Sequence, residues 1–142
     1  MFVVDASVWV ARFMRPDVNH VASHQWLLRV LEDGVLIMAP GLLLPEITGP
    51  VSRLSSEIDA RRALSFVQRL FNLRLIPLRY ELAHLSARLA AQFRLRGADS
   101  VYVALARQYH LPLVTWDGEQ RERATALVTV RTPTDLLAGH DL

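Results

Sequence analysis

Four widely separated acidic residues, Asp5, Glu46, Asp99 and Asp117, are the part of this sequence best suited to chemistry. Asp5 and Asp117 follow short apolar runs, whereas Glu46 and Asp99 lie near the expected starts of helices. Carboxylates that share a site repel one another, so one must protonate unless a cation is bound. Oxygen ligands favour Mg²⁺ or Mn²⁺ over zinc. The four acids are therefore candidate catalytic and metal-binding residues.

The reaction that such a site supports is hydrolysis of a phosphodiester bond. A bound metal lowers the pKa of its water, and one or two metals stabilise the attacking and leaving oxygens of an in-line displacement. No side-chain nucleophile is needed, because the carboxylates hold the metal and one of them can orient the water. The sequence leaves open whether one metal or two would bind.

Each acid also has a structural explanation. Asp117-Gly118 is a common turn pair, and Asp99 could simply cap a helix. Asp5 is harder to explain in this way because it follows a strand near the start of the chain. Glu46 stands alone in a long apolar region, where an unpaired charge is costly. The set of four together favours a site.

Two missing residue types exclude competing chemistry. The chain has no cysteine, which excludes disulfides, thiolate zinc sites and cysteine nucleophiles. It also has no lysine, since all 16 basic residues are arginine, and phosphotransfer through an aspartyl phosphate normally needs a lysine. Arginine suits phosphate recognition, but it equally suits ordinary ion pairs. The net charge of +2 therefore says little about partners.

Length and composition predict one compact domain, residues 1–142, with a substantial core. The chain has 142 residues, and 51% of them are hydrophobic. The first residues lack the basic segment of a signal peptide, and Pro40, Pro45 and Glu46 interrupt the longest apolar stretch. We therefore expect a soluble, cytoplasmic protein.

Short apolar runs alternate with helical patterns along the chain. The expected strands are 2–4, 35–38, 74–76, 111–115 and 127–130. The expected helices are 7–13, one capped by Asp17 and stopped by Gly34, 42–54, one capped by Ser56 and Asp59, 82–93 ended by Gly97, one opened by Asp99, and a turn or short helix at 134–137. This alternation predicts an α/β three-layer sandwich, in which helices flank a central parallel sheet of about five strands. Ligands bind at the carboxyl edge of such sheets, where all four acids can converge.

Other groups of polar residues carry weaker signals. His20 and His24 stand four residues apart on an expected helix, but no HExxH motif surrounds them, so surface histidines are the better explanation. Several arginines lie near the acids and either contact RNA phosphate or belong to solvated helix faces. These are Arg12, Arg15, Arg94, Arg96, Arg121 and Arg123.

The ordered acidic segments resemble those of PIN-domain proteins, specifically the VapC toxins of toxin–antitoxin pairs. The segments are VVDASVWV around Asp5, LLLPEITG around Glu46, GADSVYVALA around Asp99 and LPLVTWDGE around Asp117. The resemblance covers nearly the whole chain. It implies a PIN-like five-stranded sheet, a homodimer and a Mg²⁺- or Mn²⁺-dependent endoribonuclease whose acidic quartet is Asp5, Glu46, Asp99 and Asp117.

The same resemblance implies roles for neighbouring residues. Ser7 matches a small hydroxyl residue two places after the first acid, and Thr115 occupies a similar supporting place in the last motif. Trp116 departs from the pattern, because a smaller or basic residue is commoner there. Glu119 matches a further acid that some relatives carry, and the sequence gives it no primary role.

A VapC toxin is usually silenced by a small antitoxin, which lays a C-terminal segment along the toxin and directs a basic side chain into the acidic pocket. The resemblance therefore predicts an exposed apolar groove, and the helices containing Trp9, Phe13 and Trp26 are candidates for it, although aromatic residues at such spacing are more often part of the core. Two alternatives stay open: a non-catalytic PIN-fold interaction or regulatory protein, and a PIN nuclease in RNA processing without an antitoxin. The sequence does not specify the RNA.

Overall fold

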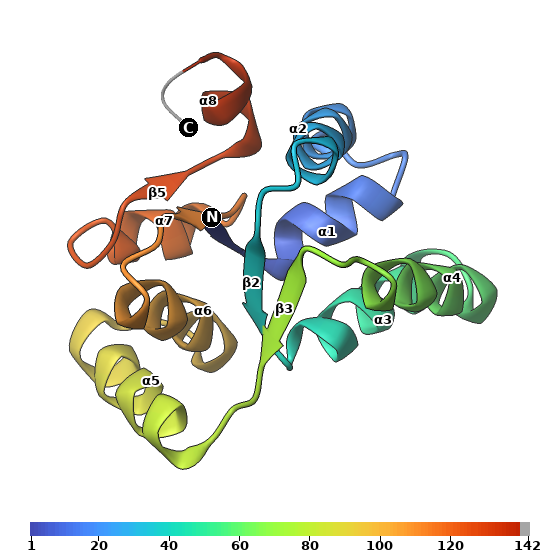
Figure 1. Ribbon diagram of the computed structural model, residues 1–142. Helices are drawn as coiled ribbons and strands as arrows, with labels where there is room; N and C mark the ends of the chain where they lie inside the picture. Colours follow the sequence, from blue (N-terminus) through green and yellow to red (C-terminus); the bar gives the residue numbers. More distant parts are fainter. Residues whose placement is uncertain (140–142) are drawn as a thin grey trace.

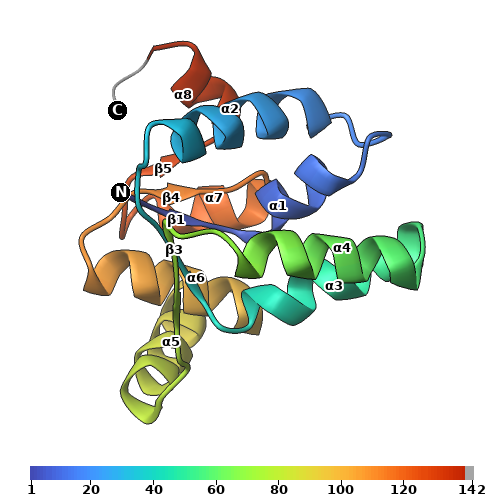
Figure 2. The ribbon, with the colours of Figure 1, turned by 45° about the vertical axis from the view of Figure 1, so that its right-hand side comes forward.

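A five-stranded parallel sheet forms the centre of the protein, in a computed structural model that describes residues 1–139. Its strands are β1 (Phe2–Val4), β2 (Ile37–Pro40), β3 (Leu73–Ile76), β4 (Leu113–Val114) and β5 (Val130–Arg131). The helices are α1 (Ala6–Phe13), α2 (His20–Glu32), α3 (Leu43–Leu54), α4 (Glu57–Gln68), α5 (Tyr80–Phe93), α6 (Gly97–Gln108), α7 (Gly118–Ala124) and α8 (Pro133–Leu137). Helices α1 to α4 lie on one side of the sheet, with α5 and α6 on the other (Figures 1 and 2). The predicted three-layer α/β architecture is confirmed.

The strand order, β3-β2-β1-β4-β5, places the first strand in the middle of the sheet. The chain moves outward from β1 through β2 to β3, then crosses back to β4 on the other side of β1. The register pairs Val3 with Leu113 and Val4 with Val114. In open parallel sheets, a crevice forms at the carboxyl ends of the strands where the order reverses. The junction of β1 and β4 is therefore the expected place for a site.

The core consists of apolar side chains from the sheet and from both helical layers. All three residues of β1 are buried, as a central parallel strand requires. Trp9, Trp26 and Tyr102 are the largest side chains that are almost fully buried. Trp9 and Trp26 therefore belong to the core, which is the alternative explanation for aromatic residues at this spacing, while Phe13 is only partly buried.

Four predicted strands have different bounds in the structure, and β3 begins one residue earlier than predicted, at Leu73. β2 begins two residues later than predicted and continues to Pro40, which still pairs with Ile76 of β3. β4 is shorter at its start, because the Leu111 amide closes the end of α6 on the Ala106 carbonyl at 2.9 Å. β5 begins only at Val130, since the backbone preceding it folds back on Ala124, the last residue of α7.

Helix ends were predicted with mixed success. Ser56 caps α4 by accepting the Asp59 amide at 3.1 Å, and Gly34 follows α2 with a φ of 64°, as predicted. Asp17 does not cap α2, because its Oδ1 accepts the Asn19 amide at 2.7 Å in the preceding turn. Gly97 does not end α5 either. The left-handed residue there is Arg94, with a φ of 55°, and Gly97 begins α6.

Two short helices near the end of the chain complete the fold. The predicted turn or short helix at 134–137 is α8, which begins at Pro133 under a capping box of Thr132 and Asp135. The sequence does not predict helix α7, because Asp117-Gly118 is a common turn pair. Within residues 1–139, no helix combines the length and the apolar character needed to cross a membrane.

Candidate active site

All four predicted acids line one cavity of about 350 Å³ at the carboxyl edge of the sheet. Asp5 follows β1 directly, and Asp117 follows β4 after two intervening residues, so the two acids flank the point where the strand order reverses. Glu46 and Asp99 lie in the first turns of α3 and α6, whose amino ends face the same edge. The topology therefore brings together residues separated by more than one hundred positions.

Asp5 is held by hydrogen bonds from two elements. It is the N-cap of α1, and its Oδ2 accepts the Ser7 amide at 3.0 Å and the Thr115 hydroxyl at 3.1 Å. Ser7 and Thr115 also contact each other through their hydroxyls at 3.2 Å. Burial raises the pKa of Asp5, while the Ser7 and Thr115 contacts oppose the rise. The two predicted supporting residues thus position the most deeply buried acid.

Asp117 combines a capping role with a place in the cavity. Its Oδ1 accepts the Gln120 amide at 2.8 Å and so caps α7, while its own amide donates to Thr115 Oγ1 at 3.1 Å. Its Oδ2 is left to face the other acids and is bound by Arg96. The structural explanation and the functional one are therefore compatible for this residue.

Glu46 lies where α3 is locally weakened. Pro50 has no N–H for the Glu46 carbonyl, so one helical hydrogen bond is missing beside the cavity. The buried Glu46 Oε1 has no hydrogen-bond partner among residues 1–139. Burial, followed by the charges of Asp5 and Asp99, raises the pKa of Glu46 to about 7. Among residues 1–139, no positively charged side chain offsets these effects on Glu46.

Asp99 is also perturbed, although an arginine contacts it. Burial, and then the charge of Asp5, raise the pKa of Asp99 to about 6, while Arg96 acts in the opposite direction. The mutual effects among Asp5, Glu46, Asp99 and Asp117 show that their charges repel across the cavity. Such repulsion is the condition that a bound divalent cation would relieve.

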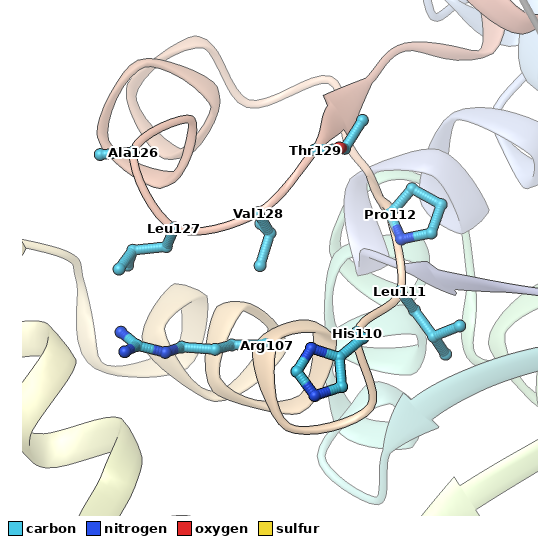
Figure 3. Close-up of a pocket in the computed structure, with 8 residues that line it drawn as sticks. All are labelled: Arg107, His110, Leu111, Pro112, Ala126, Leu127, Val128 and Thr129. Carbon is cyan, nitrogen blue, oxygen red and sulfur yellow. The ribbon is translucent and has the colours of Figure 1, made fainter.

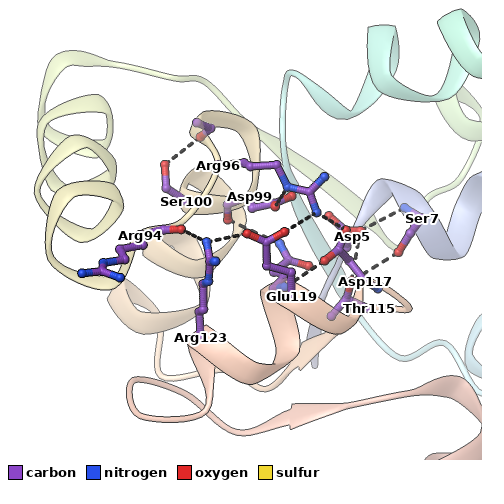
Figure 4. Close-up of polar contacts among 12 residues, drawn as sticks. Asp5, Ser7, Arg94, Arg96, Asp99, Ser100, Thr115, Asp117, Glu119 and Arg123 are labelled. Carbon is purple, nitrogen blue, oxygen red and sulfur yellow. Dashed lines mark hydrogen bonds and ion pairs between the residues drawn. The ribbon is translucent and has the colours of Figure 1, made fainter.

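Arg96, at the N-cap of α6, lies across the mouth of the acidic cluster (Figure 4). Its Nη2 is 2.6 Å from Asp117 Oδ2, and its Nε donates to Asp99 Oδ2 at 3.1 Å. The same Nη2 is 3.6 Å from Glu119 Oε2, and Glu119 also pairs with Arg123 at 2.5 Å. Glu119 does not line the cavity. It belongs to the ion-pair network outside.

The side chains fit a divalent metal in their chemistry. Every candidate donor is a carboxylate oxygen, one of these oxygens is buried without a partner, and a guanidinium already bridges two of the acids. Across residues 1–139, no three His, Asp or Glu side chains are drawn together closely enough to form a ready-made metal site. Arg96 contacts one oxygen of Asp99 and one oxygen of Asp117 in this arrangement.

The sequence does not indicate the importance of Trp116, which lines the cavity, or of Tyr102, which lies in the core near the acids. Trp116 donates its backbone amide to Ser7 Oγ at 3.1 Å and its indole Nε1–H to Ser23 Oγ at 2.7 Å. Tyr102, one turn after Asp99, is fully buried with no partner for its hydroxyl among the described residues. Burial and the charges of nearby acids raise its pKa. In the sequence, Trp116 is distinguished only by its departure from the family pattern, and no feature of the sequence points to Ser23.

Other predicted groups lie away from the acids. The His20 and His24 rings stack 6.0 Å apart, and His20 Nδ1 is 2.9 Å from the Ala11 carbonyl, with no third ligand among residues 1–139. Arg12 lies over the Phe66 ring at 4.2 Å. A larger cavity of about 510 Å³, lined by residues such as Arg107 and His110, lies at the opposite edge of the sheet (Figure 3). It contains none of the four acids.

Comparison with known proteins identifies the fold. A family model described as the PIN domain matches residues 2–126. Among solved structures, VapC20 from Mycobacterium tuberculosis, a sarcin-ricin loop cleaving toxin, gives a TM-score of 0.76 at 18% identity and covers 92% of this chain and 99% of its own. PAE2754 from Pyrobaculum aerophilum gives 0.70 at 22% identity, with coverages of 96% and 92%. VapBC2 from Rickettsia felis, bound to a DNA fragment from its promoter, gives 0.69 at 13%, with coverages of 92% and 97%. The search of curated proteins gave no match.

Proposed function

The chain belongs to the PIN-domain family, and on that premise we propose that it is a metal-dependent endoribonuclease, the toxin of a toxin–antitoxin pair. The observation that carries the proposal is the convergence of Asp5, Glu46, Asp99 and Asp117 on one cavity at the carboxyl edge of the sheet. A binding module has no reason to tolerate four mutually repelling carboxylates. A nuclease does, because the cluster attracts Mg²⁺ or Mn²⁺.

The four acids of the cavity would have different roles in metal binding and catalysis. When bound, a divalent metal would supply a water of lowered pKa and stabilise charge on the phosphodiester oxygens. Asp5, fixed by Ser7 and Thr115, provides the most rigid ligand. Glu46 offers an oxygen that has no other partner, suited to holding the cation or orienting the attacking water. Asp99 and Asp117 complete the set once Arg96 moves aside.

An antitoxin is the second part of the proposal. Similar structures include toxin–antitoxin complexes, among them one from Klebsiella pneumoniae and VapBC2. A basic antitoxin side chain would find in this cavity the same carboxylates that Arg96 already binds. The two tryptophans are buried, but exposed apolar side chains occur on α2 at Val21 and Leu28, and at Leu54 and Ile58. A homodimer, expected from the resemblance, belongs to the same proposal and is measurable by light scattering.

The direct test is cleavage of RNA by the purified protein with Mg²⁺ or Mn²⁺. Replacement of Asp5 or Asp99 by asparagine keeps the size of the side chain and removes the charge, so activity should disappear while the circular dichroism spectrum stays unchanged. Asp33→Asn, at an exposed position after α2, is the matched control and should cleave normally. Full activity in both site variants would exclude the proposal.

One observation favours a second candidate, a non-catalytic interaction module. Arg96 already neutralises part of the charge on Asp99 and Asp117 without any metal. In such a module the guanidinium would be a permanent structural bridge. The two candidates differ in metal binding, because the module would bind no Mn²⁺ in calorimetry.

The toxin role has its own test, separate from the nuclease chemistry. Expression of the protein should arrest cell growth, and Asp5→Asn should relieve the arrest. A small protein encoded immediately upstream should co-purify with the chain and restore growth. Cleavage in vitro without growth arrest would instead favour a nuclease of RNA processing.

A further inference from the structure

We propose that the acidic cavity continues into a nucleobase subsite, in which Trp116 stacks on an unpaired base of the RNA and Asp17 and Asn19 read its polar edge. All three residues line the same cavity as the four acids. The inference rests on the proposed ribonuclease function and deepens it by naming single-stranded RNA as the substrate. It assigns a specificity-determining role to residues outside the acidic quartet.

Trp116 makes two hydrogen bonds, one from its backbone amide and one from its indole ring, and the second fixes the orientation of the ring. Its backbone amide is bound by Ser7 Oγ, and its Nε1–H is bound by Ser23 Oγ at 2.7 Å. Ser23 is fully buried on α2, and no other side-chain hydrogen bond of Ser23 occurs within residues 1–139. Within the described residues, the side-chain hydrogen bond of the buried Ser23 hydroxyl is therefore made with the Trp116 ring. Trp116 is partly buried, packs against the edge of the hydrophobic core and lines the cavity.

The hydrogen bond to Ser23 decides what the ring can offer a ligand. Because Nε1–H is the only polar group of an indole and is already bound, the side chain presents no donor to the cavity. What remains is apolar π surface beside a cluster of carboxylates. Flat unpaired bases stack on such surfaces in single-stranded nucleic acids, and every base has a suitable face.

The polar groups of the proposed subsite belong to Asp17 and Asn19, in the turn before α2. Asn19 is four residues before Ser23, and its carbonyl accepts the Ser23 amide at 3.0 Å, which places the start of α2 beside the indole. The Asn19 carboxamide makes no capping hydrogen bond. Asp17 Oδ1 accepts the Asn19 amide, which orients the carboxylate and leaves Oδ2 for a ligand. These groups suit hydrogen bonds to a base.

The chemistry of these groups favours certain bases. The Asp17 side chain offers acceptor oxygens, which match donors on an unpaired base. Guanine presents two adjacent donors, its ring N1–H and its exocyclic amino group, whereas uracil presents one, its ring N3–H. We therefore expect guanine to be preferred at the nucleotide that stacks on Trp116.

The experiment combines cut-site mapping with a fluorescence scan. Wild type and Trp116→Leu are incubated with Mn²⁺ and a single-stranded RNA pool of random sequence, and the cut ends are sequenced. In parallel, 2-aminopurine is placed at successive positions of an oligoribonucleotide bound to the Asp5→Asn protein. Stacking on Trp116 should change the fluorescence at one position, and Trp116→Leu should remove that change.

The expected results separate the subsite from the nuclease. Trp116→Leu should raise KM about tenfold, which corresponds to one lost stacking contact, and should erase the base preference beside the cut. Trp116→Phe should lose less, and Asp17→Asn should reduce the preference for guanine. Mn²⁺ affinity should stay unchanged in all three. If wild type cuts no RNA, the proposed function fails, and the 2-aminopurine scan still decides the subsite.

Two outcomes would overturn the subsite. The first is Trp116→Leu with unchanged KM and unchanged base preference. The second is a 2-aminopurine scan in which no position depends on residue 116. If Trp116→Leu fails to fold, Ser23→Ala provides the same test, because it keeps the indole but removes the hydroxyl that fixes the orientation of the ring. Ser23→Ala should then weaken the base preference, and an unchanged preference would contradict the proposal.

Discussion

At the scale of single residues, the acidic cavity contains carboxylates whose ionised form is disfavoured by burial and by neighbouring negative charges. Glu46 has a pKa of about 7 and Asp99 of about 6, in both cases mainly because of burial. Capping bonds and hydroxyls compensate Asp5 and Asp117, whereas one buried Glu46 oxygen has no compensation among the described residues. In the metal-free protein, ionisation of Glu46 should therefore affect stability more than ionisation of the other acids in the cavity.

The first prediction concerns stability against pH in the presence of EDTA. The native pKa of Glu46, about 7, lies above its ordinary value of 4.5, so the native state binds more protons between these pH values. Stability should fall as pH rises through this range, with the penalty complete above pH 7 and absent below pH 4.5. Asp99 adds to the fall in the same direction.

The measurement is urea unfolding at pH 5 and pH 8. Because Glu46 is only half-buried, its contribution should be about 1 kcal/mol. Glu46→Gln should reduce the difference between the two pH values by that amount. Glu32→Gln, at an exposed position ending α2, is the control. An undiminished difference in Glu46→Gln would contradict the assignment.

The second prediction concerns Arg96. Since its guanidinium contacts oxygens of Asp99 and Asp117, Arg96→Gln should strengthen Mn²⁺ binding several-fold by freeing both carboxylates. Arg123→Gln removes the same charge nearby but touches only Glu119 among the acids, so its effect should be smaller. Weaker Mn²⁺ binding in Arg96→Gln would show instead that Arg96 organises the acids for the metal.

At the scale of elements, strong patterns in the sequence were reliable and weak ones were not. β1 and the acid that follows it were predicted because a buried parallel strand is continuously apolar. Helix α7 was missed because it has seven residues, begins with Gly118 and is mostly polar. The end of α5 was missed because Arg94, not a glycine, adopts the left-handed conformation. Local propensity alone does not determine such ends.

The third prediction tests one correctly predicted helix end. Ser56 Oγ accepts the Asp59 amide at the start of α4, so Ser56→Ala should lower the free energy of unfolding by about 1 kcal/mol. Ser52→Ala, at an exposed position inside α3, should be neutral or slightly stabilising. Equal unfolding midpoints for the two variants would mean that the cap contributes nothing.

At the scale of the whole molecule, the site is a product of topology. The four acids were predicted from their places after strands and before helices, because a parallel sheet brings these places to one edge. Arg96 and Trp116 were not predicted as site residues. Their partners, Asp117 for Arg96 and Ser23 for Trp116, lie on other elements and become neighbours only in the folded chain. Sequence patterns locate elements, but they do not specify such pairs.

The measurement that tests the central claim most directly is calorimetric titration of the EDTA-treated protein with Mn²⁺. The wild type should bind Mn²⁺ through the four carboxylates acting together. Each of Asp5→Asn, Glu46→Gln, Asp99→Asn and Asp117→Asn should weaken binding about tenfold or more. Asp33→Asn should leave binding unchanged. Absence of Mn²⁺ binding in the wild type, or equal weakening in Asp33→Asn, would contradict a metal site built from these acids.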